Sequence, residues 1–221
     1  MITLMNCDTV LALDLSTAQG MIFLIQHGRV LFEASFQSER SHNAQVFAPL
    51  AEALTHVPEN EKAVVVVGTG PGSYTGVRIA IAAAQGVGLS RNWPVIGQPS
   101  ICTASLEAYS VLGDARRGMF YHAGVEKGHL VRPPLLVTAQ EAAELVEQGG
   151  SWVSFDSRPP AGFPDLPLRR PDAGRLGQIV SRLTAAEILD LSARPLEPFY
   201  LQEAFITTAR KAGKQVPALQ K

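Results

Sequence analysis

The segment covering residues 64–89 constrains the fold of this chain more than any other. It begins with four consecutive valines after Ala63, a run typical of a strand that is buried on both faces of a parallel sheet. The glycine-rich stretch GTGPGSYTG follows at residues 68–76 and leads into a helix that we expect over residues 75–89. The sequence therefore predicts an α/β protein built around a strand, a glycine loop and a helix.

The expected helix has almost no polar side. Between Arg78 and Arg91 the polar residues are Gln85 and Ser90, and a helix that is apolar all round is usually buried all round. One face would cover the sheet, and small residues would let a second helix approach closely: Ala80, Ala82, Ala83, Ala84, Gly86 and Gly88. We therefore predict a protein–protein interface here. The alternative is that a helix expected over residues 44–54, or the second half of the chain, covers this surface.

The glycine loop fits none of the familiar catalytic or nucleotide templates. A Walker loop needs a lysine where Val77 stands, and a dinucleotide fingerprint that starts at Gly70 needs a glycine at Thr75. A hydrolase elbow around Ser73 needs glycine at Pro71 and at Thr75. We therefore interpret the glycines first as a sharp turn between a buried strand and a closely packed helix.

An anion or cation site at this loop remains an alternative. Glycine-rich loops before a helix expose backbone N–H groups that can bind an anion. The first strand ends in a short polar turn, which could hold a hydrated Mg²⁺ or a phosphate. A cofactor site, if present, would consist of Asp14, Ser16, Thr17, Gly70, Gly72 and Ser73.

Composition argues against several other functions. The net charge is −1, so no overall field attracts nucleic acid or acidic membranes. Cys7 and Cys102 form no CxxC pair, and no two of the five histidines lie three or four residues apart, so we predict no metal site. His122 and His129 flank an expected hairpin turn and should lie at the surface. Because the chain shows neither a signal-peptide pattern nor a long apolar span, we expect a cytoplasmic protein.

The order of expected elements repeats. Each half runs strand, strand, strand, helix, strand, helix, although the two halves share no alignable sequence. This order favours two related α/β lobes that meet near residue 100. We expect an N-terminal lobe over residues 1–102, a C-terminal lobe over residues 103–206 and a basic, flexible tail over residues 207–221.

These segments resemble a known family. The stretch VVVVGTGPGSYTGVRIAIAAAQGVG, together with VLALDLST at residues 10–17 and PVIG at residues 94–97, is similar to the TsaB family, also called YeaZ. The resemblance continues through DARRG at residues 114–118 and PFYL at residues 198–201, and it covers most of residues 10–202. Members are accessory subunits of the bacterial machinery that makes threonylcarbamoyladenosine at position 37 of tRNAs.

The resemblance implies a two-lobed actin/Hsp70-like (ribonuclease H-like) fold in which each lobe is a mixed sheet with helices. It also implies a paralogue of the catalytic subunit TsaD that has lost the chemistry, so the chain would not be an enzyme. It would have no cofactor of its own, and ATP or ADP would bind only in complex with partners.

The resemblance further implies partners and an interface. The chain would bind TsaD through its N-terminal lobe, TsaE would join the pair, and tRNA would be reached indirectly through the complex. Alone, the chain would form a homodimer through the same surface. The implied interface residues are His42, Gln45, Val46, Pro49, Thr75, Arg78, Ile79, Ala82, Ala83, Gly86 and Val87.

One departure from the family pattern affects the first loop, and two alternative functions remain to be considered. Leu15 stands where the family usually has threonine, which weakens any inference of phosphate binding in the first loop. An autonomous, glycoprotease-like hydrolase would need Ser73 or Cys102 as a nucleophile with a histidine base. A small-molecule kinase of the same fold would need a phosphate loop in both lobes, and residues 114–118 carry bulky side chains there.

Overall fold

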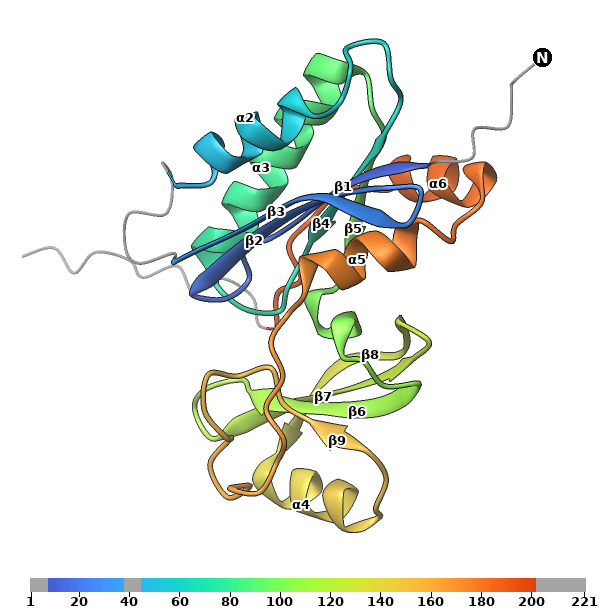
Figure 1. Ribbon diagram of the computed structural model, residues 1–221. Coiled ribbons are helices and arrows are strands. Elements are labelled where there is room, and N and C mark those ends of the chain that lie inside the picture. The colour runs from blue at the N-terminus through green and yellow to red at the C-terminus, as the bar shows by residue number, and fades with distance from the viewer. Residues whose placement is uncertain (1–7, 38–44, 202–221) are drawn as a thin grey trace, which may run out of the picture.

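Two β-sheets organise the chain, one in each of two lobes (Figure 1). The computed structural model describes residues 8–37 and 45–201. The first sheet has the strand order β3-β2-β1-β4-β5. Strands β3, β2 and β1 pair antiparallel with one another in turn. Strands β1, β4 and β5 pair parallel in turn. Its strands are β1 (Thr9–Asp14), β2 (Gln19–Gln26), β3 (Arg29–Gln37), β4 (Val64–Gly68) and β5 (Val95–Gln98).

Both faces of the first sheet are covered by helices. On one side α2 (Phe47–Thr55) and α3 (Tyr74–Arg91) pack against Val65 and Val67 of β4. On the other side α5 (Ala173–Val180) and α6 (Ala185–Ser192) pack against Val64 and Val66. Successive side chains of a strand point to opposite faces, so the four valines serve both cores. The doubly buried strand predicted from the sequence is confirmed.

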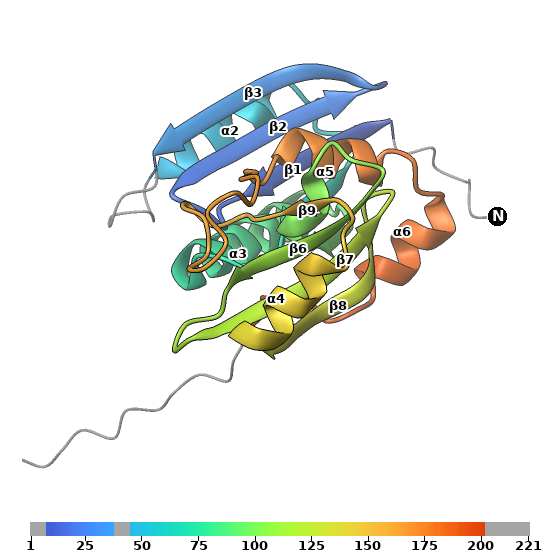
Figure 2. The same cartoon turned by 90° about the horizontal axis from the view of Figure 1, so that it is seen from below.

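The second lobe is smaller and has one sheet with a single helix. Its strand order is β8-β7-β6-β9, and a short 3₁₀ helix, η1 (Ser100–Thr103), precedes it. Helix α4 lies at the end of the molecule away from the first lobe (Figures 1 and 2). A capping box begins α4, because Thr138 and Glu141 bond each other's backbone N–H. The remaining elements are β6 (Ala108–Asp114), β7 (Met119–Glu126), β8 (His129–Thr138), α4 (Ala139–Glu147) and β9 (Trp152–Val153).

The prediction of two lobes with mixed sheets is confirmed, but the last two helices lie elsewhere than expected. Helices α5 and α6 fall within residues 103–206, yet they pack on the first sheet (Figure 1). The reason is that β1 and β4 are apolar on both faces, so the first sheet needs a second helical layer. The chain returns from the second lobe to supply that layer. The amphipathic pattern around Leu176 predicts the helix without specifying which sheet it covers.

Other boundaries and exposures also differ from the sequence prediction. The helix expected over residues 44–54 is α2, and residue 44 and the basic tail at 207–221 lie outside the described residues. His122 is buried, not at the surface, because β7 extends to Glu126 and leaves this histidine in mid-strand. Its ring lies 5.1 Å from that of Trp152. Burial, with a smaller effect from Arg132, lowers the pKa of His122. His129 is exposed, as expected.

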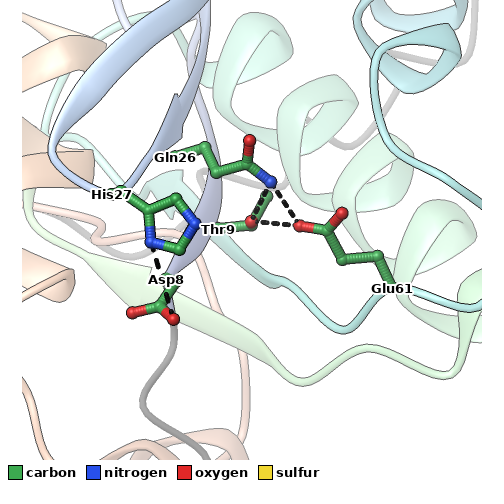
Figure 3. Close-up of polar contacts among 5 residues, drawn as sticks. All are labelled: Asp8, Thr9, Gln26, His27 and Glu61. Carbon is green, nitrogen blue, oxygen red and sulfur yellow. Dashed lines mark hydrogen bonds and ion pairs between the residues drawn. The ribbon is translucent and has the colours of Figure 1, made fainter.

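A polar cluster closes the first sheet at the end opposite the glycine loop (Figure 3). The Glu61 carboxylate accepts hydrogen bonds from Thr9 Oγ1 and Gln26 Nε2, both at 2.5 Å. Beside it, His27 Nδ1 lies 3.6 Å from Asp8 Oδ2. The cluster joins the beginning of β1, the end of β2 and the segment that precedes β4.

Among the helices of the described residues, none is long and apolar enough to cross a membrane.

Candidate functional site

The glycines of the loop between β4 and α3 allow two loops to pack in direct contact. A β-carbon on Gly72 would overlap the carbonyl oxygen of Ser16, and one on Gly76 would overlap that of Leu15. Both acceptors belong to the turn between β1 and β2. Gly70 adopts a φ of +90°, which side chains rarely allow. Close packing and backbone conformation therefore account for these three glycines without any ligand.

Several N–H groups of this loop already have acceptors within the chain. Ser73 N donates to the Ser16 carbonyl at 2.6 Å, and Gly70 N donates to Ser100 Oγ at 3.0 Å. Ser73 Oγ accepts from Gly76 N at 3.2 Å and thereby caps α3. These donors would have to break existing bonds before they could bind a phosphate.

Asp14 lies at the centre of the same junction and is fully inside the protein. Its Oδ1 accepts from Ser16 N at 2.7 Å and from Ser16 Oγ at 2.6 Å, whereas Oδ2 has no geometrically acceptable hydrogen-bond partner. Ser100 Oγ lies nearby and favours the charged form, but burial has the larger effect and raises the pKa of Asp14. A buried carboxyl of this kind holds the turn in its conformation, and it is less suited to bind a metal ion than an exposed carboxylate would be.

The six residues predicted as a possible cofactor site do lie together. Asp14 and Ser16 are buried, Thr17 is half-buried, and Gly70, Gly72 and Ser73 form the facing loop. They mostly satisfy each other's hydrogen-bonding groups. Within residues 8–37 and 45–201, no group of three or more histidine, cysteine or acidic side chains could hold a metal ion. A cofactor at this junction stays a prediction.

Helix α3 has an exposed side after all, and that side carries one exposed charged residue, Arg78, beside polar, small and apolar ones. Ala82 and Gly86 are exposed near the middle of the helix, and Leu89 is 88% exposed near its end. The inward face packs on the first sheet and α2 through Val77, Ala80, Ile81, Ala83, Ala84 and Val87. Helix α2 adds Phe47, which is 55% exposed. We call the exposed sides of α2 and α3 the α2–α3 face.

The implied interface residues divide by their burial. Gln45, Thr75, Arg78, Ala82 and Gly86 are exposed, and Pro49 and Ile79 are half-buried. Val46, Ala83 and Val87 must be corrected, because they are buried in the core of the first lobe and cannot contact a partner without unfolding it. The sequence could not separate Ala82 from Ala83, since neighbouring alanines carry no polar–apolar contrast. His42 lies outside the described residues.

Gly86 has no internal reason to be glycine. A β-carbon added there would meet nothing within 4 Å, and glycine in a helix interior costs about 1 kcal/mol relative to alanine. Gly88, one position beyond Val87, is different, because a β-carbon there would overlap Val95. An unexplained glycine on an exposed helix face is the kind of residue that lets another backbone approach closely.

An aromatic cluster borders the α2–α3 face, and sequence reasoning did not find its contacts. The Arg78 guanidinium lies 4.1 Å from the ring centroid of Tyr74, and its Nε donates to Tyr200 Oη at 2.6 Å. The two tyrosine rings are 5.3 Å apart. The hydrogen bond that Arg78 donates to Tyr200 raises the pKa of Arg78. Because 122 residues separate Arg78 from Tyr200, no local pattern could have paired them.

Comparison with known proteins shows which proteins this chain is similar to. The family model described as "TsaD: tRNA N6-adenosine threonylcarbamoyltransferase" matches residues 36–142. The chain is 29% identical over 174 residues to the tRNA threonylcarbamoyladenosine biosynthesis protein TsaB of Escherichia coli K12, which is 71% of this chain and 74% of that protein. It is 35% identical over 88 residues to TsaB of Buchnera aphidicola, which is 39% of each chain.

The chain is similar to TsaB (YeaZ) proteins in sequence. The solved structure of YeaZ from Pseudomonas aeruginosa has the same fold, with a TM-score of 0.59 and 21% identity over 82% of this chain and 97% of that one. The expected two-lobed actin/Hsp70-like architecture is therefore confirmed.

In this chain, the groups that a hydrolase or a kinase would use are poorly placed. Burial raises the pKa of the Cys102 thiol to about 12, so it stays protonated and unreactive at neutral pH. Ser73 Oγ is occupied as a helix cap. In the second lobe, Arg116 and Arg117 form the turn between β6 and β7 with left-handed φ values of 66° and 57°. That turn has side chains where a phosphate loop has glycine.

Proposed function

We propose that this chain is a non-catalytic subunit in tRNA threonylcarbamoyladenosine biosynthesis. It binds TsaD, and with it TsaE, and supports transfer of the threonylcarbamoyl group to adenosine 37 of tRNA. The observation that carries the proposal is the α2–α3 face, which exposes Phe47, Ala82, Gly86 and Leu89 and has Glu52 and Arg78 as the exposed charged residues of its two helices. Similarity to the curated relatives supplies the pathway, because they are named for it.

The α2–α3 face has the features of a contact surface between proteins. Leu89 and Phe47 expose large apolar side chains, and the exposed Gly86 removes the steric barrier to a second helix. Arg78 and the tyrosines around it provide aromatic and guanidinium groups at its edge, which are enriched at interface hot spots. We propose that TsaD occupies this face and that a second copy of the chain occupies it when TsaD is absent.

A non-catalytic role agrees with the chemistry of the junction at Asp14. The carboxyl is buried, the neighbouring N–H groups are used within the chain, and the cysteine available to a hydrolase is buried as well. An autonomous hydrolase and a small-molecule kinase are therefore treated as outcomes of the test.

The first experiment measures association. Arginine at position 82 would place a charge in the middle of the α2–α3 face while the exposed position leaves the fold within about 0.5 kcal/mol of wild type. We expect Ala82→Arg to weaken binding to TsaD by about tenfold or more, because an unpaired charge buried in an interface is strongly destabilising. Ala193→Arg, at the exposed end of α6, is the matched control. Unchanged binding of Ala82→Arg would remove this face from the interface.

The second experiment measures the reaction. The purified chain alone should transfer no threonylcarbamoyl group, and adding it to TsaD, TsaE and threonylcarbamoyl-adenylate should restore transfer. Ala82→Arg should reduce that restoration, and Ala193→Arg should not. Transfer by the isolated chain, or hydrolysis of a peptide or phosphorylation of a small molecule by it, would contradict the proposal.

A further inference from the structure

A cleft between the two lobes lies away from the glycine loop and away from the α2–α3 face. It has a volume of about 200 Å³, enough for a small ligand with several water molecules. One wall is the turn between β7 and β8, with Lys127 and His129, and the other is formed by α5 and the beginning of α6, with Arg175, Arg182 and Glu187. Segments from both lobes therefore line it.

The lining of this cleft is strongly cationic, although the whole chain has a net charge of −1. Lys127, Arg175 and Arg182 are basic side chains, and within the described residues none of them forms an ion pair. The facing carboxylate is that of Glu187, whose Oε2 accepts from Thr184 N and Oγ1 at 2.8 and 2.7 Å. Positive charge predominates in the cleft because three basic side chains line it against this one carboxylate.

Arg175 also has an unused hydrogen-bond donor. Its Nη1 donates to Gln178 Oε1 at 3.2 Å, while its Nε is buried and has no hydrogen-bond partner. A buried donor without an acceptor is energetically unfavourable. An anion bound beside the guanidinium is one group that would supply the missing acceptor.

The wall contributed by the second lobe is held in place. Gln98 Nε2 donates to the Gly128 carbonyl at 3.0 Å, and Lys127 N donates to the Glu107 carbonyl at 2.7 Å. Gly128, with a φ of +80°, lies so close to α5 that a β-carbon would be 2.8 Å from Ile179 Cδ1. The backbone that carries Lys127 is therefore held in place before any ligand arrives, which reduces the entropic cost of binding.

We propose that this interlobe cleft binds a phosphate group through Lys127, Arg175 and Arg182. Phosphate fits better than a carboxylate because it can accept from three cationic side chains at once, and the planar guanidinium matches its oxygens. A phosphate held there connects the two lobes through side chains of both. It can come from a free phosphate compound or from the backbone of RNA, and the inference does not depend on the binding of TsaD.

Calorimetric titration of the full chain tests the proposal. The probes are inorganic phosphate, at constant ionic strength against chloride, and a short single-stranded RNA of mixed sequence. Lys127→Asn keeps a residue that tolerates the left-handed backbone at this position, and Arg182→Gln alters an exposed side chain. Arg158→Gln, at an exposed arginine outside the cleft, is the matched control.

Each cleft variant should weaken binding roughly two- to fivefold, and the double variant should weaken it by the product of the two, with the control unchanged. If phosphate and RNA both respond, the site accepts a free phosphate group; if RNA alone responds, the source is the RNA backbone. The proposal is overturned if neither probe binds, or if the cleft variants bind both probes as the control does.

Discussion

Replacing Gly86 by alanine should stabilise the isolated chain, and replacing Gly88 by alanine should destabilise it. Both glycines lie in α3, two residues apart. An added β-carbon at Gly86 meets nothing within 4 Å, so the helix-propensity gain of about 1 kcal/mol is realised in full. At Gly88 it overlaps Val95 Cγ2 and lies 3.0 Å from the Trp93 carbonyl oxygen. Overpacking of this kind costs about 1–3 kcal/mol, which equals or exceeds the same gain.

Urea and thermal unfolding of the two variants measure this difference. For a chain of 221 residues, about 1 kcal/mol corresponds to a shift of roughly 2–4 °C in the midpoint. We expect Gly86→Ala to melt higher than wild type and Gly88→Ala to melt lower. If Gly86→Ala also weakens binding to TsaD, the glycine is present for the partner and not for the fold. Destabilisation by Gly86→Ala would refute the reasoning, since it would mean that this face is packed within the chain.

Three further outcomes follow from buried or bordering groups. Burial raises the pKa of Asp14, so the folded state keeps the proton of this carboxyl to a higher pH than the unfolded state does. The free energy of unfolding should therefore fall as the pH rises from the unfolded-state pKa to the folded-state pKa. Asp14→Asn should lessen that fall in urea unfolding across about pH 4 to 8; an unaltered pH profile would show that the charge is compensated. Cys102 should react with iodoacetamide only as fast as the chain unfolds, and rapid labelling of the native protein would contradict its burial. Tyr200→Phe removes the acceptor for Arg78 Nε and should weaken TsaD binding, as measured by surface plasmon resonance. The thermal midpoint, measured by calorimetry, should fall by no more than about 2 °C.

Local sequence determined much of the fold. Four consecutive valines required a strand covered on both faces, and the capping boxes at Thr138 and Thr184 set the beginnings of α4 and α6. The glycine loop was correctly interpreted as a tight junction. It matches no phosphate or nucleophile template, so its glycines were expected to serve the turn and the close packing of the helix. These inferences depend on backbone geometry over a few residues, which the sequence encodes directly.

The candidate site was predicted only in part, because helix periodicity gives no direction where every residue is small or apolar. In α3, Ala82 is exposed and Ala83 is buried, yet both are alanine. The sequence identified the helix as an interface candidate, and the packing of α2 and the first sheet decided which of its residues remain available to a partner.

Contacts between distant segments were decided by the tertiary structure. The amphipathic pattern predicts α5, but its position on the first sheet depends on which apolar faces remain uncovered once both sheets have formed. The pairing of Arg78 with Tyr200 and the cationic cleft at Lys127 depend equally on this return of the chain to the first lobe. Spacing along the chain records short-range preferences, whereas burying both faces of the first sheet is a condition on the whole molecule. The sequence by itself therefore determined the strand, the loop and the apolar helix, and the tertiary structure decided which side of that helix stays exposed.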